Sequence, residues 1–263
     1  MAEQIPGFHS FAFKHNGIDH TVYKAGTGPG ILIMHELPGM ARPCIDFAKR
    51  IIDAGFTVYL PHFFGTINKA FSNLDTSMNT MHICISREFH VFASDKTSPV
   101  VEWLRELSKL IHEECGGPGI GAIGMCLTGA FAIPLLVESP LLAPVVSQPS
   151  LPFGPLESTK KNLGCSPSDL EKAVNRCHKE DINLLCFRFS NDPIAPAEKI
   201  ETIREKFTTK SDITTIDSSP GNSHNIVESA HAVFTFNFSD VTNHPTRLAL
   251  DKVIAYYKEK LMV

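Results

Sequence analysis

The stretch Ile120-Gly121-Ala122-Ile123-Gly124-Met125-Cys126-Leu127-Thr128-Gly129 decides the fold of this chain. Its first half is a short apolar run with small residues, and a second apolar run follows Cys126 at once. This order predicts a buried strand that turns sharply into a helix, with a thiol at the turn. A thiol at a helix N-terminus lies near free N–H groups and the positive end of the helix dipole, which favour the thiolate. Cys126 is therefore a candidate nucleophile, although most cysteines are small, buried and inert.

Strand-like and helix-like segments alternate on both sides of this turn, which predicts an α/β fold with a mostly parallel central sheet and helices on both faces. The predicted strands are short apolar runs and span 18–24, 30–35, 56–60, 120–125, 143–147, 182–189 and 213–216. The predicted helices span 42–54, 98–114, 127–137, 168–179 (with Ser168 as N-cap), 195–207 and 245–261. No repeat or linker interrupts the pattern, so residues 1–263 are predicted to form one domain with a lid-like insertion at 148–181.

Composition and charge disfavour several classes of protein. The 24 basic and 28 acidic residues give a net charge of -4, so no basic field favours a nucleic-acid partner. No apolar run approaches the ~18 residues that span a bilayer, and the N-terminus lacks the pattern of a secretory signal. We therefore expect a cytoplasmic monomer or homodimer with no membrane or nucleic-acid partner.

The spacing of cysteine, histidine and glycine gives no sign of a bound group. The seven cysteines include no Cys-x-x-Cys pair and the 12 histidines no His-Glu-x-x-His, so we expect reduced thiols and no metal. Gly119, Gly121 and Gly124 match the G-x-G-x-x-G dinucleotide pattern, but they lie inside the predicted strand rather than after it. No cofactor is expected.

The turn at Cys126 fits the pattern G-x-nucleophile-x-G, in which small residues permit a strained turn that exposes the nucleophile. The chain contains no G-x-S-x-G, and the segment from Gly124 to Gly129 departs from the pattern at Thr128, where the second glycine is expected. The chain order nucleophile, acid, histidine makes Asp192 the candidate acid, because it follows the predicted strand 182–189. Taken alone, Asp192 would be read as a turn residue.

Two of the histidines that follow the last predicted strand compete for the role of base. His224 lies in an Asn-Ser-His-Asn turn at a plausible spacing from Asp192. His231 lies just before the C-terminal segment, as the histidine of an active-site loop does. We favour His231 and keep His224 as the alternative.

The loop after the first buried strand, His-Glu-Leu-Pro-Gly at 35–39, is placed to donate one backbone N–H to an oxyanion, through Leu37. The second donor would be the backbone N–H of Leu127, next to the nucleophile. Glu36 in this loop either faces Cys126 or is a solvated loop acid, and spacing alone leaves the two readings even.

Together these residues resemble the dienelactone hydrolase family of α/β-hydrolases, from about residue 28 to the C-terminus. The resemblance rests on Glu36 with Gly39, the cysteine elbow, Asp192, His231 with the Ala-Val-Phe after it, and Arg247 with Tyr256-Tyr257. It implies a triad in which Cys126 attacks a small lactone or ester, His231 acts as base and then acid, and Asp192 orients the histidine. It also implies that Glu36 contacts the resting thiol and helps to form the thiolate when substrate binds.

Arginines of the family bind the substrate carboxylate, and Arg87 is the candidate for one of them. Thr235 and Phe236 occupy the stretch of the second arginine, which counts against dienelactone itself as the substrate. The expected partner is thus a small ester or lactone. The alternative function is a non-catalytic or thiol redox-sensing member of the same fold, because a reactive thiol would also suit that role.

Overall fold

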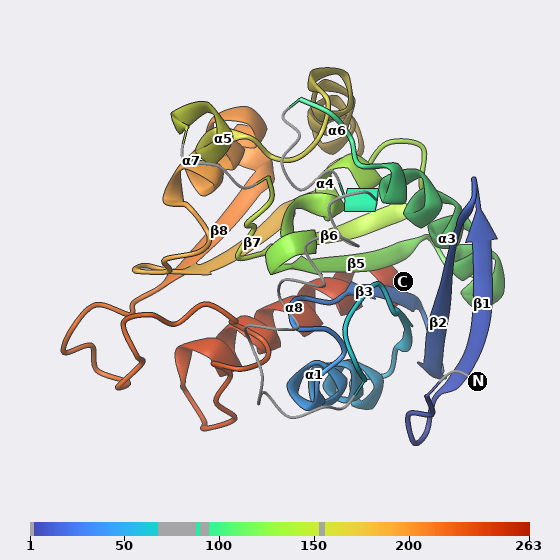
Figure 1. Ribbon diagram of the computed structural model, residues 1–263, viewed down its shortest axis with the longest axis horizontal. Helices are drawn as coiled ribbons and strands as arrows, with labels where there is room; N and C mark the ends of the chain where they lie inside the picture. Colours follow the sequence, from blue (N-terminus) through green and yellow to red (C-terminus); the bar gives the residue numbers. More distant parts are fainter. Residues whose placement is uncertain (1–2, 68–87, 90–94, 153–155) are drawn as a thin grey trace.

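The computed structural model describes residues 3–67, 88–89, 95–152 and 156–263, and an eight-stranded sheet runs through its centre (Figure 1). The strand order is β1-β2-β4-β3-β5-β6-β7-β8; β2 pairs antiparallel with β1 and β4, and all later neighbours are parallel. The strands are β1 His9–His15, β2 Ile18–Gly26, β3 Gly30–Met34, β4 Thr57–Pro61, β5 Ile120–Met125, β6 Leu141–Ser147, β7 Leu184–Phe189 and β8 Ser211–Ile216. The predicted mostly parallel α/β fold is confirmed.

Helices cover both faces of the sheet, with α1 and α8 on one face and α3, α4, α6 and α7 on the other (Figure 1). Alternate residues of β3 therefore enter two separate apolar cores: Leu32 and Met34 pack with the second group of helices, Ile31 and Ile33 with the first. The described helices are α1 Arg42–Asp53, α3 Pro99–Cys115, α4 Ala132–Leu135, α5 Glu157–Lys161, α6 Pro167–Glu180, α7 Ala197–Phe207 and α8 Pro245–Leu261, with 3-10 turns η1 Cys126–Phe131 and η2 Thr208–Lys210.

Burial on both faces of the sheet explains why continuous apolar runs in the sequence predicted the central strands. Every residue of β3, β4, β5 and β7 is buried, as expected for strands covered on both faces. The carboxyl ends of the parallel strands meet at one edge of the sheet, where α/β proteins bind their ligands. Glu36, Cys126 and Asp192 follow β3, β5 and β7 at this edge.

The segment after Cys126 corrects one prediction. The sequence predicts a single helix over 127–137, but the chain forms the 3-10 turn η1 and then the short helix α4. Pro134 has no N–H to donate to the carbonyl of Ala130, so the hydrogen-bond ladder of an α-helix cannot run through this segment.

The insertion at 148–181 corrects a second prediction, the start of the helix predicted over 168–179. Helix α6 begins after Ser166, not Ser168: the Ser166 Oγ accepts from the backbone N–H of Asp169 at 3.1 Å, and Pro167 takes the first helical position. The insertion also contains α5, which is too short to show a helical period in the sequence.

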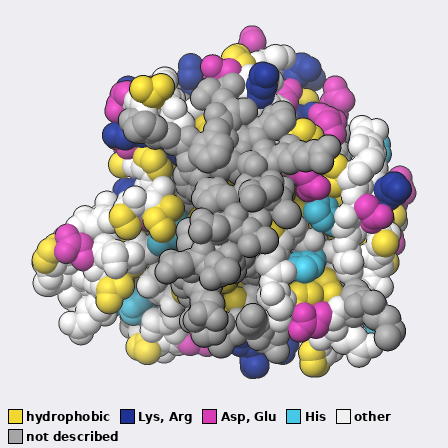
Figure 2. Space-filling model, in the orientation of Figure 1, with side chains coloured by type: hydrophobic (Ala, Val, Ile, Leu, Met, Phe, Trp, Pro, Cys, Tyr) yellow, Lys and Arg dark blue, Asp and Glu magenta, His cyan; other side chains and the backbone are white. Residues whose placement is uncertain are grey.

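The described surface carries mixed charge. Figure 2 shows Lys and Arg side chains interspersed with Asp and Glu around the rim of one face, and the net charge of the chain is -4. None of the described helices has the length and hydropathy that a membrane span needs.

Candidate active site

Cys126 lies at the point where β5 turns into η1. Its φ of 53° is in the left-handed region, which strains a residue with a side chain. The turn is also tight: a Cβ on Gly124 would lie 2.1 Å from the carbonyl oxygen of Thr128, and one on Gly129 would lie 2.6 Å from the Cα of Pro149. Only glycine fits at both positions, so the neighbouring backbone holds Cys126 in the strained conformation of a nucleophile elbow.

Thr128 accounts for the departure from the elbow pattern. Its hydroxyl donates to the carbonyl of Met34 at 2.7 Å and accepts from the backbone N–H of Met125 at 3.0 Å. These bonds tie the elbow to the end of β3. The close approach that requires a small residue has moved one position along the chain, to Gly129.

His231 and Asp192 come together at the same edge of the sheet. Nδ1 of His231 lies 2.7 and 2.9 Å from the two carboxylate oxygens of Asp192, and it must be the donor because a carboxylate only accepts. The Asp192 side chain is fully buried, and its Oδ1 accepts from the backbone N–H groups of Ile194 and Ala195 at 2.9 and 3.0 Å. The acid is thus fixed by its own loop and in turn fixes the ring.

The charge state of His231 follows from its neighbours. Burial opposes protonation of the ring, but the negative charge of Cys126 and the hydrogen bond and charge of Asp192 outweigh it and raise the pKa of His231 to about 11. Both neighbours thus favour the protonated ring. By contrast, His224 lies exposed in its loop with its ring 5.4 Å from that of His244, so it is His231 that the structure brings to Asp192.

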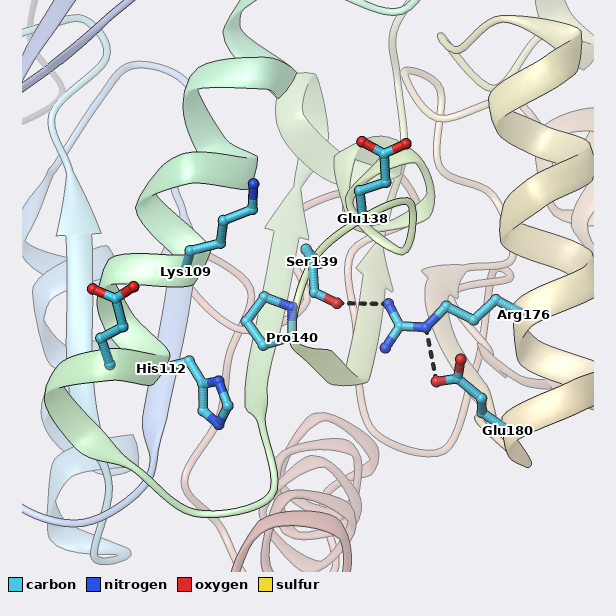
Figure 3. Close-up of a pocket in the computed structure, with 8 residues that line it drawn as sticks. Lys109, His112, Glu138, Ser139, Pro140, Arg176 and Glu180 are labelled. Carbon is cyan, nitrogen blue, oxygen red and sulfur yellow. Dashed lines mark hydrogen bonds and ion pairs between the residues drawn. The ribbon is translucent and has the colours of Figure 1, made fainter.

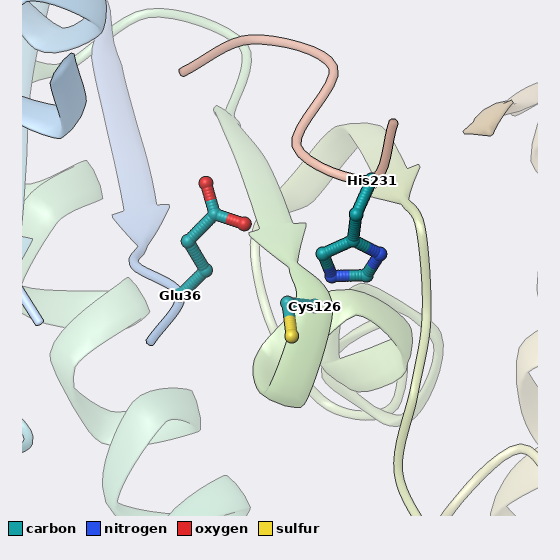
Figure 4. Close-up of side chains that lie close together, drawn as sticks. All are labelled: Glu36, Cys126 and His231. Carbon is teal, nitrogen blue, oxygen red and sulfur yellow. The ribbon is translucent and has the colours of Figure 1, made fainter. Parts of the chain in front are cut away.

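Three side chains that can share a proton converge at this point. Figure 4 shows Glu36 from the loop after β3, Cys126 from the tip of β5 and His231 from the loop after β8, and one polar atom of each lies within 4.8 Å of the others. The sulfur of Cys126 also lies 3.4 Å from the hydroxyl of Ser150, at the start of the insertion. A strained thiol, an oriented histidine and a buried acid form a site suited to nucleophilic attack.

Comparison with known proteins assigns this arrangement to a family. The model of the dienelactone hydrolase family matches residues 19–260. The chain belongs to this family. It is an ester or lactone hydrolase, as the family is. A comparison with curated protein sequences finds no significant match.

Solved structures of the same α/β-hydrolase fold are distant in sequence. A protein assigned as a dienelactone hydrolase in Klebsiella pneumoniae is 14% identical over 96% of this chain and 98% of that one, with a TM-score of 0.64. The dienelactone hydrolase of Anabaena variabilis is 11% identical over 97% and 98%, with a TM-score of 0.60. A cold-adapted esterase from an Arctic intertidal metagenomic library is 11% identical over 97% of both chains, with a TM-score of 0.56. At these identities the likeness shows the fold.

In this member of the dienelactone hydrolase family, two side chains hold Glu36. The hydroxyl of Thr235 donates to one carboxylate oxygen and the amide of Gln148 donates to the other at 3.1 Å, while the hydroxyl of Ser147 donates to the Gln148 amide oxygen. Burial raises the pKa of the Glu36 carboxyl, and the charge of His231 and these hydrogen bonds oppose the rise. Thr235 is 199 residues away from Glu36 in the chain, so no local pattern reveals this contact.

His35 fixes the loop that carries Glu36 and Leu37. Its Nδ1–H donates to the carbonyl of Glu36 at 3.1 Å, and its Nε2 accepts from the backbone N–H of Phe63 at 3.1 Å. Complete burial lowers the pKa of His35 to about 3, so the ring is neutral. Sequence reasoning quoted this histidine within its loop without assigning it a role.

Arg188 supports the loop that carries Asp192. Its guanidinium donates to the carbonyls of Ser190 at 3.1 Å, Ala195 at 3.0 Å and Asp192 at 3.4 Å. Burial lowers the pKa of Arg188, and the charge of Asp192 opposes this. The sequence does carry a signal here, because a lone arginine inside the apolar strand β7 needs buried acceptors.

The other predicted site residues are placed as follows. Leu37 follows Glu36 in the loop after β3, and Leu127 follows Cys126 in η1, so both backbone N–H groups lie in the segments that carry Glu36 and the thiol. Arg87 lies outside the described residues.

A surface pocket elsewhere has no part in this site. Figure 3 shows Lys109, His112, Glu138 and Arg176 around Ser139 and Pro140, which precede β6 and so lie at the amino ends of the parallel strands. The guanidinium of Arg176 is already bonded to the carbonyl of Ser139 at 2.8 Å and to Glu180 at 2.9 Å.

Proposed function

We propose that this protein hydrolyses a small carboxylic ester or lactone through Cys126 as a thiolate nucleophile. The observation that carries the proposal is the strained thiol at φ 53°, within 4.8 Å of a histidine whose other nitrogen is bonded to Asp192. That is the arrangement of a nucleophile, a base and an orienting acid.

The reaction would run in two steps. The Cys126 sulfur attacks the substrate carbonyl, and the backbone N–H groups of Leu37 and Leu127 stabilise the oxyanion. The C–O bond then breaks, the leaving oxygen takes the proton from Nε2 of His231, and an acyl thioester remains. Water next attacks the thioester as His231 removes its proton, and the sulfur leaves as the thiolate, which releases the acid. Asp192 holds the ring orientation through both steps.

Glu36 would act as the thiol switch. Its carboxylate lies within 4.8 Å of the Cys126 sulfur, close enough to exchange a proton with it after a small side-chain rotation. Burial favours the neutral acid, whereas the bonds from Thr235 and Gln148 favour the carboxylate. These opposing effects keep Glu36 able to take up or release the thiol proton when a substrate changes the local charge.

The surroundings support a small substrate with an apolar acyl group. Cys126 belongs to the same apolar core as Phe89, Phe131 and Leu151. Ser150 contacts the thiol, so the insertion at 148–181 begins beside the nucleophile, and we infer that it acts as a lid.

The test is Cys126→Ala, assayed against a panel of lactones and p-nitrophenyl esters. We expect loss of turnover with an unchanged fold, and a transient acyl adduct on Cys126 of the native protein by mass spectrometry. His231→Ala is expected to remove turnover, and His224→Ala is the matched control. Turnover that survives Cys126→Ala would refute the mechanism. Rapid alkylation of Cys126 by iodoacetamide with no turnover of any ester would instead support the thiol redox-sensing alternative.

A further inference from the structure

The cluster of Glu36, Cys126 and His231 has the composition of a zinc site. Carboxylate, thiolate and imidazole are the three ligand types that bind Zn²⁺ in proteins. Here one atom of each lies within 4.8 Å of the others, and Glu36 and Cys126 are buried (Figure 4). The three side chains come from three segments that are far apart in the sequence, so they meet through the fold and not through a local sequence motif.

The orientation of His231 suits a metal ion as well as catalysis. Its Nδ1–H is held by both oxygens of Asp192, at 2.7 and 2.9 Å. Its Nε2 is buried and has no hydrogen-bond partner in the part of the chain that the structure describes. A carboxylate that holds the far nitrogen of a ligating histidine is the usual arrangement around protein-bound zinc.

The distances permit coordination after a small movement. Zinc lies about 2.3 Å from sulfur and about 2.0–2.2 Å from nitrogen and oxygen, so adjacent ligand atoms in a tetrahedron are about 3.3–3.7 Å apart. The present atoms need to approach by about 1 Å, which side-chain rotation of Cys126 and Glu36 supplies. Glu36 can keep its bonds from Thr235 and Gln148, because each carboxylate oxygen has a second lone pair.

We propose that Glu36, Cys126 and His231 bind one Zn²⁺ ion and that the bound ion reversibly blocks the thiol. The metal takes the place of the single proton that Cys126 and His231 share, and this proton is released to solvent. The fourth ligand is water, as in sites with three protein ligands. The two negative charges of Glu36 and the thiolate balance the ion, which removes the main penalty of burying it.

Binding is tested on the full-length protein, freed of metal by a chelator, with Co²⁺ as a spectroscopic probe and Zn²⁺ in calorimetric titration. We expect one ion per chain, release of about one proton per ion, a thiolate-to-cobalt charge-transfer band and visible bands of tetrahedral Co²⁺. Zn²⁺ should displace Co²⁺, and hydrolysis should be inhibited and then restored by chelation.

The variants separate this site from other histidines. Cys126→Ser should remove the charge-transfer band, Glu36→Gln should weaken binding, and Asp192→Asn should weaken it by about 10–100-fold through the loss of the bond to His231. The exposed His224 lies beside His244, with the two ring centroids 5.4 Å apart, so His224→Ala is the matched control for adventitious binding to histidine and should leave binding unchanged.

Two outcomes would overturn the proposal: absence of the charge-transfer band in the native protein, or binding that survives Cys126→Ser and is lost in His224→Ala. These readouts do not depend on turnover. Metal binding without any ester hydrolysis would therefore count against the proposed function alone, and hydrolysis without the cobalt band would count against the metal site alone.

Discussion

Low pH should destabilise this protein through His35. The ring links the carbonyl of Glu36 to the backbone N–H of Phe63 only as a neutral imidazole, because Nε2 must accept a hydrogen bond. Burial lowers the pKa of His35 from 6.5 to about 3. In the unfolded chain His35 therefore takes up a proton near pH 6.5, whereas in the folded protein it stays neutral down to about pH 3. More protons on the unfolded state mean that the free energy of unfolding falls as the pH drops through this window.

The magnitude follows from the same two values. At about 1.4 kcal/mol per pH unit, the whole window corresponds to about 5 kcal/mol, and the part between pH 6.5 and 4 to about 3 kcal/mol. This is a large share of the 5–15 kcal/mol that is typical for a folded domain. We expect His35→Gln to be less stable than the native protein at pH 7.5, and the difference to shrink by about 3 kcal/mol at pH 4.

Urea unfolding, followed through the single buried tryptophan, Trp103, measures this difference at each pH. Taking the difference between the native protein and the variant cancels the contributions of the other titrating groups. A gap between native protein and His35→Gln that is the same at pH 7.5 and pH 4 would refute the reasoning.

Three further predictions concern residues behind the catalytic groups. Thr235→Val removes a donor to the buried Glu36, so the limb of the pH–rate profile that reports this carboxyl should move to higher pH, while Thr235→Ser should leave it in place. Arg188→Met leaves three carbonyls around Asp192 without a donor, so urea unfolding should show a loss of about 2–4 kcal/mol and kcat should fall at least about tenfold. Lys199 is buried with its ammonium on three carbonyls of the insertion, and burial lowers its pKa to about 8. The folded protein thus loses this proton before the unfolded chain does, so its free energy of unfolding should rise by about 3 kcal/mol from pH 8 to 10.5 through this group, and Lys199→Met should lack the rise.

The sheet was predictable where burial on both faces leaves a continuous apolar run. The strand 120–125 was predicted with the bounds that β5 has, and β3, β4 and β7 were predicted to within about two residues. The edge strand β1 was missed because only alternate residues of it face the core. Its signal was present in Asn16-Gly17, with φ values of 48° and 79°, which is the turn that joins two antiparallel strands.

Sequence order selected Cys126 and Asp192 and left two candidate histidines, His224 and His231, of which the structure brings His231 to Asp192. Cys126, Asp192 and His231 each follow a predicted strand, and parallel strands end at the same edge of the sheet. Sequence order could not find Ser150, nor the bonds from Thr235 and Gln148 to Glu36. These are contacts between polar side chains of distant segments, and a buried serine or threonine carries no periodic signal.

The missed residues share a physical cause. A site built at strand ends places irregular backbone in the interior, and buried carbonyls without partners are costly. This chain meets the need with basic side chains that bond to carbonyls: His35 behind the loop of Glu36, Arg188 behind the loop of Asp192, and Lys199 behind the insertion. Burial lowers the pKa of each of them, because burial opposes the charged form of all three side chains. Replacing His35 or Arg188 with an apolar residue should therefore disturb the position of a catalytic loop as well as lower the free energy of unfolding, while the two apolar cores on either side of the sheet remain intact.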